Sequence, residues 1–93
     1  MCEEMKKFRE YLDQNNIDWV DMSSVYEDMK DFSITRTHFI YKNKKVSVIN
    51  GMGTYGGIDV FGIKNHGLLE VMIGGNDPVG WLTCEEAIKL TFN

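Results

Sequence analysis

The segment Gly51–Gly57 has the composition best suited to binding a ligand through the backbone, since four of its seven residues are glycine. Glycines let backbone N–H groups converge and let a ligand come close, which suits a phosphate group. The segment lacks the Gly-Lys-Ser/Thr ending of a P-loop and the following helix of a dinucleotide fingerprint. A wide turn or β-bulge is therefore the first interpretation, with a partner-binding loop that exposes Met52 and Tyr55 as another. A phosphate site is the alternative, formed by Gly51, Gly53, Tyr55, Gly56, Gly57 and Lys64.

The histidines and cysteines do not form a pattern that carries catalysis. A nucleophile such as Cys84 would need His38 or His66 beside it and a carboxylate to orient the imidazole. Nothing in the spacing of these residues indicates that arrangement. Cys2 and Cys84 stand at opposite ends of the chain, and no pair of ligands has the spacing of a zinc site. Both cysteines are expected to be ordinary thiols, and no cofactor is expected.

Acidic residues near the glycine-rich segment could in principle hold a divalent cation. Asp59, Glu70 and Asp77 are the candidates, but they lack the alternating spacing of a cation-binding loop. The sequence therefore predicts no metal site and no enzyme.

Helices are predicted at both ends of the chain. Met5, Phe8 and Leu12 recur at helical spacing within residues 3–14, and acidic residues occupy the first turn. The run Thr83-Cys84-Glu85-Glu86 has the form of a capping box and predicts a short C-terminal helix. A second capping-box pattern begins at Ser24 and predicts a short helix over residues 24–30.

The strands predicted between the helices alternate or are rich in β-branched and aromatic residues. A tight turn at Lys42-Asn43-Lys44 joins two of them. The predicted strands cover residues 17–20, 33–41, 45–50, 58–61, 68–73 and 79–82, of which the first, fourth and last are short. Tight turns require antiparallel pairing. The expected fold is α+β, one domain over residues 1–93, with an antiparallel sheet of about four strands and both helices on one face.

Charge is distributed in blocks along the chain. The net charge is −4, but residues 1–33 hold nine acidic and four basic residues, a balance of −5. Residues 34–66 balance to +4 and residues 67–93 to −3. Two solvated faces of a small domain would explain this pattern. A surface that attracts a basic partner would explain it too. An overall negative charge opposes the field of nucleic acid phosphates, so direct nucleic acid binding is not expected.

The acidic N-terminal third supplies the predicted contact with a basic partner. The predicted contact residues are Asp18, Asp21, Glu27, Asp28 and Asp31, with Tyr55 and Trp81 as aromatic anchors. The charged N-terminus predicts neither a secretory signal nor a transit peptide, and no apolar run is long enough to span a membrane. A cytoplasmic protein is expected.

The chain resembles small accessory proteins carried by phages and prophages of low-GC Gram-positive bacteria. The resemblance rests on its size, its acidic N-terminal third, its lysine- and asparagine-rich turns and three motifs. These motifs are Gly51–Gly57, Leu68-Leu69-Glu70, and Gly80-Trp81-Leu82-Thr83 followed by Glu85-Glu86. Many proteins of that kind inhibit host defence, anti-CRISPR proteins among them, often by covering a basic nucleic-acid-binding surface with carboxylates. Others sequester cyclic-nucleotide signals.

The resulting functional hypothesis is a non-enzymatic, acidic inhibitor that binds a host protein with a basic surface. The alternative is a nucleotide-binding sponge that uses residues 51–57. The sequence leaves a homodimer open.

Overall fold

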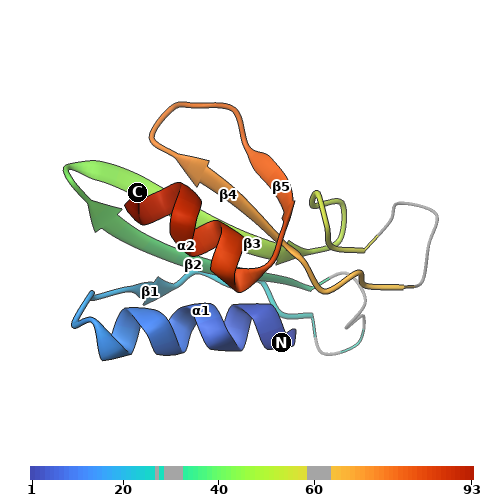
Figure 1. Ribbon diagram of the computed structural model, residues 1–93. Helices are drawn as coiled ribbons and strands as arrows, with labels where there is room; N and C mark the ends of the chain where they lie inside the picture. Colours follow the sequence, from blue (N-terminus) through green and yellow to red (C-terminus); the bar gives the residue numbers. More distant parts are fainter. Residues whose placement is uncertain (27, 29–32, 59–63) are drawn as a thin grey trace.

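The computed structural model describes residues 1–26, 28, 33–58 and 64–93 and contains two helices and one sheet (Figure 1). The elements in chain order are α1 (Glu3–Gln14), β1 (Val20–Asp21), β2 (Ile34–Tyr41), β3 (Lys44–Gly51), β4 (Leu69–Ile73), β5 (Val79–Leu82) and α2 (Cys84–Phe92). Every neighbouring pair of strands is antiparallel, and the strands follow chain order across the sheet. The α+β class is confirmed. The sheet has five strands rather than about four, because both short segments beside the long strands pair with them.

One face of the sheet carries the core, and both helices cover it (Figure 1). Pairing across the strands aligns Phe39 with Val46 and Val48 with Val71. These four side chains are buried against the apolar stripe of α1, whose Met5, Phe8 and Leu12 are fully buried. Burying one such side chain contributes roughly 1.5–3 kcal/mol to the free energy of folding. The helical spacing of Met5, Phe8 and Leu12 therefore reflects packing in the core.

A tight hairpin turn joins β2 and β3, as predicted, but it has two residues, Lys42 and Asn43, rather than three. Lys42 and Asn43 have φ angles of 50° and 64°. Positive φ at both central residues gives a turn whose twist matches that of the flanking strands. Lys44 is the first residue of β3 rather than part of the turn.

The capping box at the start of α2 is confirmed. The backbone amide of Glu86 donates to the Thr83 hydroxyl at 3.2 Å, and the amide of Thr83 donates to the Glu86 carboxylate at 3.0 Å. These two bonds satisfy donors that a helix start otherwise leaves without partners.

The predicted helix start at Ser24 is wrong. Ser24 forms a β-bridge with Ile34, in which each backbone amide donates to the other residue's carbonyl, at 2.8 and 2.9 Å. This pairing extends the contact between β2 and the chain after β1, so the backbone of Ser24 is already used in sheet-like bonds. The rest of the predicted helix falls mostly outside the described residues, as does the strand predicted over residues 58–61 after Ile58. No helix within the described ranges is long and apolar enough to cross a membrane.

Candidate functional site

The glycine-rich segment folds back on itself, and its own atoms use most of its backbone donors. The amide of Gly51 donates to the Thr54 hydroxyl, that of Gly57 to the Thr54 carbonyl, and that of Gly53 to the Ile58 carbonyl, each at 3.0 Å. A phosphate group would have to displace these bonds to be held by the same amides. The geometry therefore favours a packed turn over a phosphate cradle. Lys64, the other residue of the predicted phosphate site, is exposed.

Two of the glycines are required by close packing. A Cβ on Gly57 would lie 2.1 Å from the Thr54 hydroxyl oxygen and 2.2 Å from the Gly51 carbonyl oxygen. A Cβ on Gly80, in β5, would lie 2.1 Å from the Cβ of Tyr55. These distances are shorter than a Cβ atom can adopt, so the glycine-rich segment packs closely against itself and against β5.

A buried carboxylate fixes the tip of this segment. The Glu70 side chain lies on β4, and the residue is only 8% exposed. Its carboxylate accepts a 3.0 Å hydrogen bond from the backbone amide of Tyr55. Glu70 therefore holds the glycine-rich segment on the sheet. Of the two other acidic residues considered as candidates for a divalent cation, Asp77 is exposed and Asp59 lies outside the described residues.

The structure brings Tyr55 and Trp81 together. The Trp81 amide donates to the Tyr55 carbonyl at 3.1 Å, and the two residues are 52% and 56% exposed. Trp81 has a φ of 60°, an uncommon backbone conformation for a bulky residue, where the register of β5 against β4 is irregular. The ring of His66 packs edge-on against Trp81 with its centroid 5.1 Å away. We call Tyr55, His66 and Trp81 the aromatic site.

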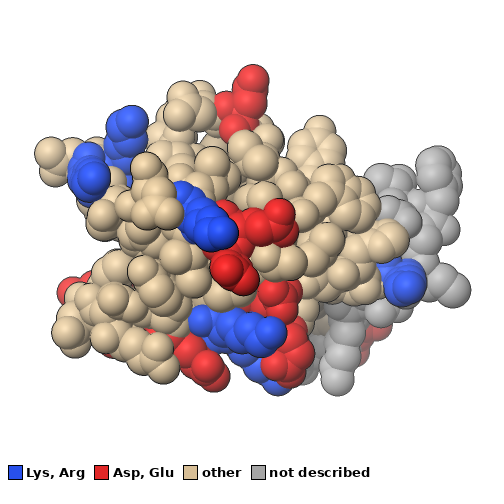
Figure 2. All heavy atoms as spheres, in the orientation of Figure 1, with Lys and Arg blue, Asp and Glu red and all other residues tan. Residues whose placement is uncertain are grey.

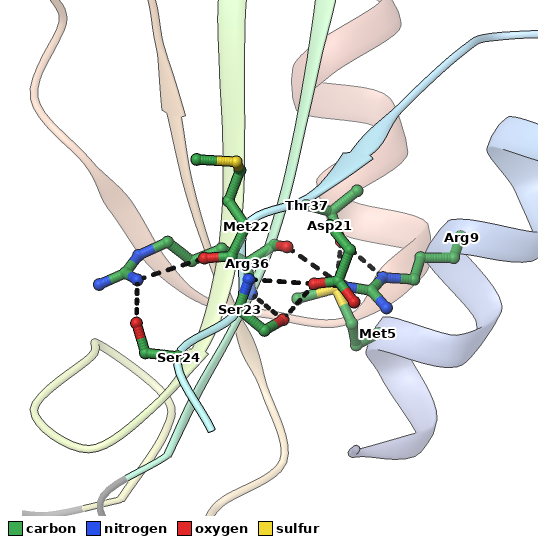
Figure 3. Close-up of polar contacts among 8 residues, drawn as sticks. All are labelled: Met5, Arg9, Asp21, Met22, Ser23, Ser24, Arg36 and Thr37. Atoms are coloured by element: carbon green, nitrogen blue, oxygen red, sulfur yellow. Dashed lines mark hydrogen bonds and ion pairs between the residues drawn. The ribbon is translucent and has the colours of Figure 1, made fainter. Parts of the chain in front are cut away.

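Among the predicted acidic contacts, Asp21 has a structural role. Its carboxylate accepts hydrogen bonds from the amide and hydroxyl of Ser23 and from the Arg9 guanidinium at 3.2 Å (Figure 3). The hydrogen bonds from Ser23, together with the charge of Arg9, hold the pKa of Asp21 below its ordinary value. Arg9 also donates to the Thr37 hydroxyl at 2.7 Å and to the Arg36 carbonyl at 3.1 Å. Asp21 therefore fastens α1 to the edge of the sheet.

The structure describes two of the four other acidic residues predicted as contacts in the N-terminal third. Asp18 and Asp28 are exposed, and Glu27 and Asp31 lie outside the described residues. Carboxylates gather instead over the first turns of α1 and α2, interleaved with lysines (Figure 2). The members of this mixed patch are Glu3, Glu4, Lys6, Lys7, Glu85, Glu86 and Lys89.

From the sequence, Glu3, Glu4, Glu85 and Glu86 are interpreted only as residues of helix N-termini. Carboxylates at these positions are favoured by the helix dipole, which is the local reason for their presence. That the two helix starts adjoin depends on tertiary docking, for which the chain carries no local signal.

Two of the groups considered as nucleophile or base, Cys84 and His38, lie where their surroundings shift their pKa values. Cys84 is buried, and burial together with the nearby Glu4 carboxylate raises the pKa of its thiol, which disfavours the reactive thiolate. Burial, with Lys45 and Arg36 nearby, lowers the pKa of His38. In the part of the chain that the structure describes, no three His, Cys, Asp or Glu side chains are grouped to hold a metal ion.

Comparison with known proteins adds no further constraint. No protein family, curated protein or solved structure matches this chain. The aromatic site and the mixed patch are therefore interpreted from their own chemistry.

Proposed function

We propose that this protein is a non-enzymatic inhibitor that binds a partner protein through Tyr55 and Trp81. One observation carries the proposal: two large aromatic side chains, each more than half exposed, are joined through their backbones at 3.1 Å. Tyrosine and tryptophan dominate the energetics of protein interfaces because each buries a large area and loses few rotamers. An exposed pair of this kind has no evident role in the core.

The aromatic site is held rigidly, which favours binding. The buried carboxylate of Glu70 fixes the backbone of Tyr55, and the close approach at Gly80 fixes the same residue against β5. A surface that is ordered before it meets a partner loses less conformational entropy on binding. The left-handed backbone of Trp81 supports the same inference, because strained residues concentrate at functional sites.

The partner we propose carries a basic surface. The net charge of −4 and the exposed Asp18 and Asp28 support an attractive field for such a partner. Glu85 and Glu86 follow Trp81 within five residues, so carboxylates stand close to it in the chain. In its most specific form, the proposal is a phage-encoded inhibitor of host defence that masks a nucleic-acid-binding surface. The alternative, a nucleotide sponge, is less favoured because the amides of Gly51, Gly53 and Gly57 are used within the loop.

The test measures affinity for a partner captured from a lysate of Gram-positive bacterial cells and then purified. Trp81→Ala and Tyr55→Ala should each raise the dissociation constant by about 30-fold, as hot-spot truncations do. Val79→Ala, on the same strand and 44% exposed, is the matched control and should change it by less than about threefold. Equal affinities of the unchanged protein and the three variants would show that the partner does not contact the aromatic site.

A second pair of variants tests the charge of the partner. Asp18→Lys and Asp28→Lys together should weaken binding and flatten its dependence on salt, because exposed charges act through a screened field. Asp21 is left unchanged, since its loss would disturb the Arg9 contacts. Tighter binding by the double variant would indicate an acidic partner and contradict the proposal.

A further inference from the structure

A second surface feature lies at the end of the sheet away from the glycine-rich segment (Figure 1). It is a pocket of about 440 Å³ between the β2–β3 hairpin, the chain after β4 and the last turn of α2. Its walls are largely apolar, and the apolar or aromatic residues that form them are Tyr41, Val46, Ile73, Leu90 and Phe92. Pockets of this size and composition hold small organic molecules.

The charged side chains that line the pocket are all basic. Lys42 and Lys44 come from the hairpin, and the ammonium group of Lys42 lies 5.4 Å from the centroid of the Tyr41 ring. Among the described residues, no Asp or Glu side chain lines it. The pocket therefore combines an apolar interior with a rim that carries two lysines and two asparagines, Asn76 and Asn93, whereas the protein as a whole is negative.

An unsatisfied hydroxyl group is part of the same pocket wall. Thr91 is 9% exposed, and its hydroxyl oxygen is buried without a hydrogen-bond partner in the described part of the structure. Native proteins rarely leave a buried hydroxyl in this state, and a missing ligand or water is a common explanation. This observation is independent of the lysines and also indicates an occupant.

We propose that this pocket binds a small amphipathic anion, an apolar ring or short chain that carries one carboxylate, sulfonate or phosphate group. The apolar body packs between Val46, Ile73 and Phe92, and the anionic group meets Lys42 and Lys44. The Thr91 hydroxyl oxygen is almost inaccessible in the free protein, so it donates to the ligand only when the ligand enters beneath the last turn of α2. This site is separate from the aromatic site, and the proposal does not depend on the identity of the protein partner.

The test uses anilinonaphthalene sulfonate, whose fluorescence rises in apolar sites, and octanoate as a non-fluorescent competitor. We expect saturable binding of the dye to the whole protein and its displacement by octanoate. The amide resonances of Ile73, Leu90 and Phe92 should move on addition of octanoate, whereas those of Gly53 and Trp81 should not. Absence of binding, or movement confined to Trp81 and its neighbours, would overturn the proposal.

Two adjacent lysines give a matched pair of variants. Lys44 pairs with Tyr41 on the helix-covered side, while its neighbour Lys45 pairs with Ile40 and points to the other face. Lys44→Ala should weaken dye binding by about fivefold, and Lys45→Ala by less than about twofold. Equal effects of the two variants would mean that the dye responds to net charge alone, which contradicts the assigned site.

Thr91→Val tests the hydroxyl without changing the shape of the side chain. If the hydroxyl lacks an internal partner, its removal should raise the melting temperature of the free protein, because an unsatisfied buried group is lost. The same change should weaken octanoate binding. A lower melting temperature would show that the hydroxyl is hydrogen-bonded within the free protein, and unchanged octanoate affinity would show that it does not meet the ligand. Either result would overturn its role.

Discussion

The carboxylate of Glu4 accepts a 2.8 Å hydrogen bond from the backbone amide of Cys84, 80 positions further along the chain. Glu4 lies in the first turn of α1, and Cys84 is the first residue of α2. The other carboxylate oxygen of Glu4 pairs with Lys7 at 3.3 Å. One side chain thus satisfies the start of a second helix and ties the two helices together.

The first prediction concerns this bond. Glu4→Ala should lower the free energy of unfolding by about 1.5 kcal/mol, because a charge-assisted hydrogen bond is lost and the Cys84 amide loses its partner. Glu3→Ala is the control, since Glu3 is exposed and pairs only with Lys6 within the described structure. Its effect should stay within about 0.5 kcal/mol. Urea unfolding measures both, and equal losses would show that Glu4 acts only as one surface charge among several.

The second prediction is an acid-dependent loss of stability. The hydrogen bond from the Cys84 amide lowers the pKa of Glu4 from its ordinary 4.5, and those from Ser23 lower the pKa of Asp21 from 3.8. A carboxylate whose pKa is lower in the folded state binds protons more readily when unfolded. Its contribution is complete above the unfolded-state pKa and is lost as the pH falls through the folded-state value.

The melting temperature should therefore be level from pH 7 to about pH 5 with respect to these two groups and decline below about pH 4.5. Glu4→Gln should reduce the decline, because it removes one of the carboxylates that take up protons on unfolding, among which are Glu4, Asp21 and Glu86. An acid decline of the same size in this variant would mean that other carboxylates are responsible.

The parts of the fold that the sequence predicts correctly are those specified by patterns within a few neighbouring residues. The stripe of Met5, Phe8 and Leu12 and the capping box at Thr83 each lie within a few residues, and both predictions are confirmed. The helix predicted to start at Ser24 is wrong because the prediction used only a local pattern. Its capping-box pattern is local, but pairing with Ile34 supplies its backbone with sheet-like partners that no local rule indicates.

The candidate site depended more on tertiary structure. The sequence predicts Tyr55 and Trp81 separately as aromatic anchors, and their contact requires the glycine-rich segment to fold onto β5. The role of Asp21 was not predictable either, because the Arg9 that binds it comes from another element and is nearly buried there. A count of charges along the chain predicts a charged binding surface only when the charged side chains are not paired within the protein, and Asp21 is paired with Arg9.

The third prediction uses two glycines that differ only in their surroundings. Gly57→Ala should lower the free energy of unfolding by about 2 kcal/mol or more, because the new Cβ would collide with the Gly51 carbonyl, which is backbone and cannot turn away. Gly75→Ala is the control, since nothing lies within 4 Å of a Cβ at that position. Chemical denaturation of both variants makes the comparison. A Gly57 variant as stable as the Gly75 variant would show that the segment is loosely packed.

The fourth prediction separates stability from binding at Trp81. Its φ of 60° suits asparagine far better than a bulky aromatic residue. Trp81→Asn should relieve backbone strain of about 1 kcal/mol and lose a similar amount of apolar burial, since half of the residue is already exposed. The free energy of unfolding should then change by less than about 1 kcal/mol, while partner binding is lost. Thermal unfolding and partner affinity are measured on the same samples. Loss of binding together with a large loss of stability would mean that Trp81 supports the fold, because a residue kept for contact should be dispensable to folding.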